Sequence, residues 1–222
     1  MKISQRLVII TALFVTCLIT ANVITTKLIG LGFLVFPAAI IVFPLSYIFG
    51  DVLTEVYGFS TARRVIWLGF LCNLIFVFFV WIGQILPAAS FWKNQEAYVN
   101  ILGAAPRILL ASFLGYLVGE FSNSMILSRL KVIMQGRWLW VRTISSTVVG
   151  EGFDTAIFLT VAFFGTPSFI PIMIIYHWTA KVLIEIAATP ITYVLVNWLK
   201  KAEATDQYDA KISFNPFSVK AD

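Results

Sequence analysis

The chain has 222 residues, of which 59% are hydrophobic and only 12% are charged. A soluble domain is about half apolar and about a quarter charged, and this chain holds too few polar residues to cover a soluble core. The mean hydropathy of +0.90 agrees. Because the 16 basic residues lie between apolar runs and form no single stripe, the net charge of +5 does not indicate a nucleic-acid partner. The composition therefore predicts an all-α integral membrane protein.

Six segments are long enough to cross a bilayer, which takes about 20 helical residues. They run over Leu7–Ile29, Phe33–Val56, Val65–Leu86, Ile108–Leu130, Thr143–Phe164 and Phe169–Leu199. Pro37 and Pro44 predict an irregular second helix, and Pro190 predicts a bend in the sixth. We expect one transmembrane transport domain over residues 1–201 and a flexible cytoplasmic C-terminal tail over residues 202–222.

Basic residues alternate between the connections, which predicts the orientation of the chain. Four connections or ends hold Lys2, Arg6, Arg63, Arg64, Arg129, Lys131, Arg137, Arg142, Lys200 and Lys201. The other three hold only Lys93 and Arg107, with Lys27 near the end of the first span. Since positive residues mark the cytoplasmic side, we expect both termini in the cytoplasm and the chain in the cell membrane, which in a bacterium is the inner membrane.

Acidic residues lie where lipid-facing side chains would be expected. Six of the eleven acids fall inside the predicted spans, namely Asp51, Glu55, Glu120, Glu151, Asp154 and Glu185. Each charge at a helix centre costs about 2.5–3.5 kcal/mol on insertion scales. These side chains should therefore face the interior of the bundle or a water-filled cavity.

The spacing of these groups supports one shared polar interior. Asp51 and Glu55 are four residues apart, and Glu151 and Asp154 are three apart, so each pair shares a helical face. His177, Lys181 and Glu185 follow each other at intervals of four on the sixth span. Two readings of the lysine stay open, because it can pair within its own helix with Glu185 or bridge to Asp154 or Glu151. In the fourth span, Gly115 and Gly119 form a G-x-x-x-G pattern typical of close helix packing.

Several kinds of chemistry have no motif in this chain. There is no G-x-x-x-x-G-K-[ST], H-E-x-x-H or G-x-S-x-G pattern, which argues against ATP hydrolysis and against the common hydrolases. One histidine and two cysteines within apolar runs, Cys17 and Cys72, make a metal site or another cofactor unexpected. A transporter needs only a polar binding site within the bilayer, so we expect a transporter and not an enzyme. An intramembrane enzyme with paired carboxylates remains an alternative.

Two stretches carry a family resemblance. One is Ala21-Asn22-Val23-Ile24-Thr25-Thr26-Lys27, and the other, residues 43–58, reads F-P-x-x-Y-x-x-x-D-x-x-x-E-x-Y-G. With Ala62-Arg63-Arg64, Glu151-Gly152-Phe153-Asp154-Thr155 and Lys181-Val182, the chain resembles the queuosine precursor transporter family of bacteria and archaea. The resemblance covers nearly the whole chain except the tail.

The resemblance implies both a fold and a function. That family is similar in fold to the six-helix substrate-binding subunits of energy-coupling-factor vitamin importers, and its members import 7-deazaguanine bases for the queuosine of transfer RNA. The alternative is a subunit that binds another small heterocycle or vitamin and works with a separate ATPase. The first span has no A-x-x-x-A patch for docking such a module, since Ala12 and Ala21 are its only alanines. This favours a solitary transporter, and a homodimer is left open.

A deazaguanine substrate predicts roles for the polar residues. One carboxylate, that of Asp154 or Glu151, would accept the N1–H and 2-amino donors together. Asn22, Lys181 or a hydroxyl would reach the O6 acceptor. The ring of Phe153, Trp178 or Tyr47 would stack on the flat face of the base. The full set of predicted substrate-binding residues is Asn22, Tyr47, Asp51, Glu55, Glu120, Glu151, Phe153, Asp154, His177, Trp178, Lys181 and Glu185.

Overall fold

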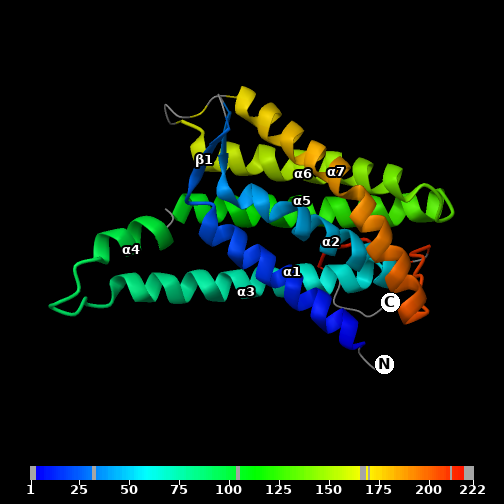
Figure 1. Cartoon of the computed structure of the whole chain (residues 1–222), viewed down its shortest axis with the longest axis horizontal. Helices are drawn as coiled ribbons and strands as arrows, with labels where there is room; N and C mark the ends of the chain where they lie inside the picture. The colour runs from blue at the N-terminus through cyan, green and yellow to red at the C-terminus, as the bar shows by residue number, and fades with distance from the viewer. Residues whose placement is uncertain are drawn as a thin grey trace.

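The computed structural model describes residues 4–31, 34–103, 106–165, 169, 171–210 and 212–217. Its long helices pack into one bundle, some along the long axis and others crossing it obliquely (Figure 1). The elements are α1 Gln5–Ile24, β1 Leu28–Leu31, β2 Leu34–Pro37, the 3₁₀ helix η1 Ala38–Ile41, α2 Phe43–Tyr57, α3 Phe59–Ile85, α4 Gln95–Leu102, α5 Pro106–Ile133, α6 Leu139–Phe163 and α7 Ile172–Glu203. The predicted all-α membrane bundle is confirmed.

Five of these helices are long and apolar enough to cross a membrane, namely α1, α3, α5, α6 and α7. Their outward faces carry large apolar side chains, and Phe79, Ile191 and Val194 are each more than half exposed. Such a surface suits lipid and not water. The chain is therefore a multi-pass membrane protein.

The second predicted span, Phe33–Val56, is wrong in its first part. Leu34–Pro37 form strand β2, which pairs antiparallel with β1, and α2 begins only at Phe43. Proline explains the break, because Pro37 cannot donate a backbone hydrogen bond and Pro44 fits the first turn of a helix. Helix α2 is about 22 Å long, which is shorter than a hydrocarbon core of about 30 Å.

Helix α2 lies in the middle of the bundle. Ten of its fifteen residues are buried, and it packs against α1, α3, α5 and α7. Six consecutive residues are at most 1% exposed, namely those from Asp51 to Val56. Because protein and not lipid surrounds α2, it can carry polar residues through the membrane region.

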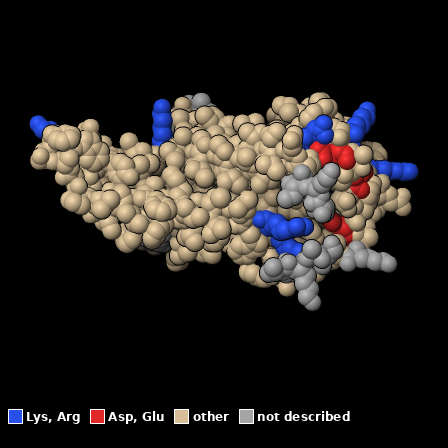
Figure 2. Space-filling model, turned by 90° about the horizontal axis from the view of Figure 1, so that it is seen from below, with Lys and Arg blue, Asp and Glu red and all other residues tan. Residues whose placement is uncertain are grey.

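The bundle has two distinct ends. We call the end with the α2–α3 junction at Gly58, the α5–α6 turn at Gly136 and the end of α7 at Glu203 the inner end, and the opposite one the hairpin end (Figure 1). The start of α1 also lies at the inner end, since Arg6 pairs with Glu203 at 3.1 Å. On the face in Figure 2, the acidic and most of the basic side chains gather at this end. The side of the membrane that it faces stays a prediction.

The close packing expected from Gly115 and Gly119 is confirmed between α5 and α6. A Cβ atom added at Gly119 would lie 3.0 Å from the carbonyl oxygen of Gly150. One added at Gly115 would meet the carboxylate of Asp154 at 2.7 Å. The two backbones approach this closely because glycine has no side chain.

The tail packs against the bundle, although we expected a flexible one. Residues 204–210 and 212–217, the C-terminal strap, lie along the inner end. The backbone N–H of Phe59 donates to Asp209 at 2.8 Å, and the indole N–H of Trp67 donates to the Pro216 carbonyl at 2.8 Å. The ring of Phe214 packs on that of Phe59, with centroids 5.1 Å apart. The strap thus covers the start of α3.

Candidate functional site

A cavity of about 170 Å³ lies inside the half of the bundle nearer the hairpin end. Its walls come from the end of α1, from β2, η1 and the start of α2, and from the inward faces of α5, α6 and α7. A protein cavity of about 150 Å³ accepts a benzene molecule. This cavity therefore has the scale of a site for one small ring compound.

Seven of the twelve predicted residues line this cavity. They are Asn22, Tyr47, Glu120, Glu151, Asp154, His177 and Lys181. They come from five different helices, as expected for charged groups that avoid lipid by facing one another. The shared polar interior that the spacing predicted is present.

Lys181 holds two carboxylates together at the centre of the cavity. Its ammonium lies 2.7 Å from Oε2 of Glu151 and 2.5 Å from Oδ2 of Asp154. The alternative pairing within α7, between Lys181 and Glu185, is wrong, since neither carboxylate oxygen of Glu185 has a hydrogen-bond partner among the described residues. The bridge leaves one oxygen of each α6 carboxylate available to a ligand.

A flat aromatic wall stands beside this charged centre. The rings of Phe43 and Tyr47 stack with centroids 6.0 Å apart and planes 9° apart, because residues four apart share a helical face. The Lys181 ammonium lies 4.8 Å from the centroid of Phe43. Across the cavity, Phe36 of β2 contacts His177 of α7. Phe43 was not among the predicted residues, although its spacing from Tyr47 places both on one face.

Asn22 is held in place by a small network of side chains. Its amide nitrogen donates to Asn73 of α3 at 2.5 Å, and its amide oxygen accepts from the Ser112 hydroxyl of α5 at 3.3 Å. Asn73 in turn donates to the Gly69 carbonyl at 3.0 Å. The network joins three helices and fixes the orientation of Asn22 at the cavity wall.

Other polar groups at the cavity have no partner within the protein. The carboxylate of Glu120 makes no hydrogen bond or ion pair with any described residue. The hydroxyls of Tyr47 and Thr155 are likewise without a hydrogen bond in the described part of the chain. Buried polar groups are nearly always paired, so Tyr47 and Thr155 are candidates for contacts with a ligand, and the unpaired, half-buried Glu120 in the cavity wall is a third. Thr155 lies one residue from Asp154, but no feature of the sequence had marked it.

Five predicted residues lie outside the cavity wall. Phe153 is 48% exposed, because two residues along a helix turn a side chain to the far face from Glu151. The Trp178 indole donates to the Val148 carbonyl at 2.9 Å and so ties α7 to α6. Asp51 and Glu185 are fully buried. The fifth residue is Glu55.

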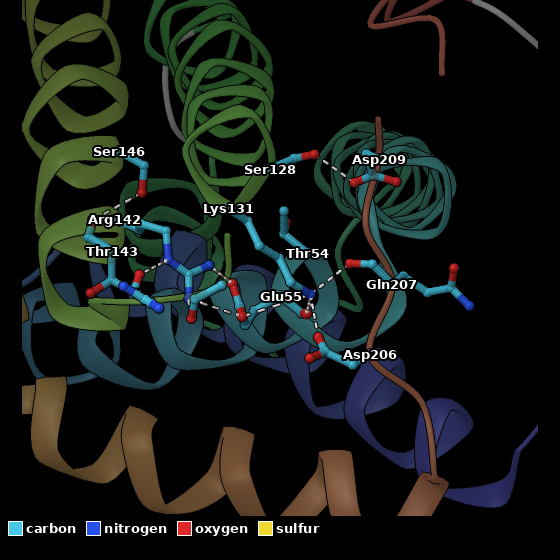
Figure 3. Close-up of polar contacts among 12 residues, drawn as sticks. Thr54, Glu55, Ser128, Lys131, Arg142, Thr143, Ser146, Asp206, Gln207 and Asp209 are labelled. Carbon is cyan, nitrogen blue, oxygen red and sulfur yellow. Dashed lines mark hydrogen bonds and ion pairs between the residues drawn. The ribbon is translucent and has the colours of Figure 1, made fainter. Parts of the chain in front are cut away.

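Glu55 lies at the inner end within a group of charges that we call the inner ion cluster, namely Glu55, Lys131, Arg142, Lys200 and Asp206. Figure 3 shows all of these except Lys200 with labels. Its fully buried carboxylate pairs with Arg142 of α6 and lies 2.7 Å from the Lys200 ammonium of α7. Lys131 of α5 donates to the Glu55 carbonyl at 2.6 Å and to Asp206 of the strap at 2.5 Å. The cluster joins four helices and the strap at the inner end.

Metal coordination has no evident place in this arrangement. Across the described ranges, no group of three or more His, Cys, Asp or Glu side chains is placed to hold a metal ion. What the cavity offers instead is carboxylate acceptors, one ammonium and an aromatic wall. This set can recognise a flat ring that carries several N–H donors.

Three bacterial relatives are similar to this chain. A "Probable queuosine precursor transporter" of Bacillus subtilis (strain 168) is 40% identical over 118 residues, which cover 52% of this chain and 51% of the relative. The "Queuosine precursor transporter" of Escherichia coli (strain K12) is 27% identical over 168 residues, 72% of each chain. A "Probable queuosine precursor transporter" of Haemophilus influenzae is 27% identical over 122 residues, 55% of this chain and 49% of the relative.

The chain thus spans about half the length of two of these relatives. No solved structure matches it. The sequence model of one protein family matches residues 37–195, which include α2 and most of the residues that line the cavity. The chain belongs to that family, which is described as "Putative vitamin uptake transporter".

Proposed function

We propose that this chain is a membrane transporter that takes up a 7-deazaguanine precursor of queuosine through the cavity. The names of the three relatives support the substrate class. The observation that carries the proposal is the cavity within the bundle, where the Lys181-bridged carboxylates of Glu151 and Asp154 face an aromatic wall. A flat base with several N–H donors fits those groups.

Glu120 is the strongest candidate for the main contact. A deazaguanine presents N1–H and the 2-amino group side by side, and one carboxylate can accept both. Lys181 already occupies one oxygen of Glu151 and one of Asp154, whereas both oxygens of Glu120 are free of described partners. The base would then stack on Phe43 and Tyr47, and Lys181 or the Tyr47 hydroxyl would donate to O6.

Restoration of transfer-RNA queuosine tests this function. A bacterial host without precursor synthesis and without its own importer receives this gene and is fed each deazaguanine at low concentration. We expect at least one base to restore queuosine, and Glu120→Gln or Asp154→Asn to weaken uptake about tenfold or more, since a hydrogen bond to a charged group contributes roughly 1.5–3 kcal/mol. The matched control is Glu96→Gln on the exposed helix α4.

The outcomes of that experiment are decisive. No queuosine with any base, from a protein shown to be inserted, would overturn the assignment. The family description favours one second candidate, uptake of a vitamin with a flat heterocycle. Saturable binding of such a vitamin to the purified chain, with no binding of deazaguanines, would establish that alternative.

We also propose that the chain transports without an ATPase partner. The resemblance to energy-coupling-factor subunits implies docking through an A-x-x-x-A patch on the first helix, and the alanines of α1, Ala12 and Ala21, are nine positions apart. Purified chain in liposomes should then exchange labelled base across the membrane. Exchange that requires an added ATPase would contradict this part of the proposal.

A further inference from the structure

Two buried carboxyl groups belong neither to the cavity wall nor to the inner ion cluster. Asp51 on α2 and Glu185 on α7 are both 0% exposed. Neither oxygen of Glu185, nor Oδ2 of Asp51, has a hydrogen-bond partner in the described part of the chain. The other Asp51 oxygen accepts from the Asn123 amide at 3.1 Å. Buried polar groups without partners are rare in native proteins and call for an explanation.

Both groups lie between the cavity and the inner ion cluster. Asp51 is one helical turn beyond Tyr47, which lines the cavity, and one turn before Glu55, which belongs to the cluster. Glu185 is one turn beyond Lys181, the cation at the centre of the cavity. The helices that carry the two carboxyl groups, α2 and α7, pack against each other. They therefore form a single acidic site on the route from the cavity to the inner end.

The groups that face Glu185 from its neighbouring helices are acidic or neutral. Glu151 faces it from α6, and Asp51 and Tyr47 face it from α2. On its own helix, Lys181 is one turn away, but its ammonium is engaged by Glu151 and Asp154. No cation on the described elements neutralises Glu185.

Asp51 has a similar environment. Glu120 and the Asn123 amide face it from α5, Glu185 faces it from α7, and Glu55 follows on its own helix. The helices α1 and α3 contribute the apolar side chains of the core, and Phe14 of α1 lies beside Gly50. The site is thus enclosed by acids, one amide and apolar groups.

An ionised carboxylate without a partner is costly to bury, and the protonated form avoids that cost. In a transporter, every cycle passes through a closed state in which neither side has access to the site. Two buried negative charges would oppose the formation of that state, whereas a protonated site would permit it. Protonation of the site would therefore favour closure around a bound base.

We propose that Asp51 and Glu185 form a proton-binding site that couples inward transport of the base to inward transport of a proton. The proposal rests on the proposed function of the cavity. The proton enters from the hairpin end through the cavity, binds to the carboxyl pair, and leaves towards the inner end once the inner ion cluster opens. No covalent bond is made or broken.

Two transport assays on the purified chain in liposomes test the site. Counterflow, the exchange of labelled for unlabelled base, requires only binding and the movement of the site across the membrane. Accumulation driven by an acidic exterior also requires proton coupling. We expect the wild-type chain to accumulate base under the pH gradient, to acidify the interior as reported by a pH-sensitive dye, and to lose accumulation when a protonophore is added.

Substitution should separate the two assays. In Glu185→Gln and Asp51→Asn, the ratio of gradient-driven accumulation to counterflow should fall at least about tenfold, which corresponds to about 1.4 kcal/mol of lost coupling. The control Glu96→Gln, an exposed acid on α4, should keep the wild-type ratio. A ratio in Glu185→Gln equal to that of the wild type would overturn the proposal.

The failure of this inference differs from the failure of the proposed function. Absence of counterflow with every deazaguanine in the wild-type chain would overturn the function itself. Counterflow without any response to the pH gradient, or with accumulation driven by a sodium gradient alone, would overturn the proton site and leave the function standing. Because these outcomes use the wild-type chain, they decide the matter even if both variants fail to fold.

Discussion

Glu55 and Arg142 form a fully buried ion pair at the inner end of the bundle. Both terminal nitrogens of the Arg142 guanidinium donate to the Glu55 carboxylate (Figure 3), and these side chains are 1% and 0% exposed. Such two-point contacts are among the stronger interactions between side chains. The pair joins α2 to α6, two helices that also line the cavity, and so holds these helices together at the inner end.

Removal of the Glu55 charge should destabilise the protein strongly. Glu55→Gln leaves Arg142, Lys131 and Lys200 without their shared partner, and breaking a buried pair from one side costs about 3–5 kcal/mol. We expect a clear fall in the thermal unfolding midpoint of the purified protein in detergent. Glu203→Gln is the control, because its partner Arg6 is 46% exposed and such pairs contribute about 0–1 kcal/mol. Equal shifts in the two variants would contradict the structural role of the cluster.

Asp209 stabilises the start of α3 from a distance. The N-cap position of α3 is Gly58, which has no side chain to accept a hydrogen bond, and Asp209 of the strap accepts from the Phe59 N–H at 2.8 Å. Loss of a helix cap costs about 0.5–2 kcal/mol, so we expect Asp209→Ala to lower stability by about 1 kcal/mol and to expose the strap to protease. Gln207→Ala, which removes an exposed side chain of the same segment, should leave both unchanged. If the strap resisted protease equally well in Asp209→Ala and in Gln207→Ala, this capping role would be ruled out.

The strap should loosen in acid. Burial raises the pKa of Asp206, but hydrogen bonds from Lys131 and Lys200 outweigh that effect and hold the pKa below its usual value. An Asp with a lowered folded-state pKa stabilises the fold above its unfolded value of about 3.9, and this contribution is lost as the pH falls through the folded value. A spin label at position 213 should therefore become mobile only below about pH 4. In Asp206→Asn, the label should already be mobile at neutral pH. If the label in that variant instead became mobile at the same acidic pH as in the wild-type chain, this account would be refuted.

The sequence predicts those features that follow from the free-energy cost of placing a charged side chain in the bilayer. Charged groups such as Glu151, Asp154 and Lys181 must leave the lipid, so their common interior site follows from hydropathy and spacing alone. The same spacing left two possibilities for Lys181, namely a pair with Glu185 on its own helix or a bridge to Asp154 or Glu151. The structure selects one of them, with Lys181 bonded to both acids of α6.

Features that depend on contacts between distant segments were not predictable. Asp209 and Phe59 are 150 positions apart, and nothing local in a polar tail indicates that it packs on a helix start. The start of α2 was misplaced because an apolar run does not distinguish a buried hairpin from a helix, although Pro37 and Pro44 indicated irregularity. Phe43 lines the cavity, whereas Phe153 lies on the exposed side of its helix. Only the helical face on which each ring lies separates the two cases.

Two glycines of α6 that are two positions apart should respond in opposite ways to alanine. A Cβ atom at Gly150 would lie 2.9 Å from the Gly119 carbonyl oxygen, whereas the nearest atom to a Cβ at Gly152 is the Trp178 nitrogen at 3.5 Å. Alanine improves helix propensity at either site by about 1 kcal/mol, and overpacking costs about 1–3 kcal/mol.

We therefore expect Gly150→Ala to lower the unfolding midpoint, since its Cβ forces α5 and α6 apart. Gly152→Ala should keep the midpoint or raise it, because the new methyl group meets an ordinary contact distance. The two variants differ from the wild-type chain by the same single methyl group on the same helix, so each controls for the other. A midpoint for Gly150→Ala at or above that of Gly152→Ala would show that the two helices are not in the close contact seen at Gly119.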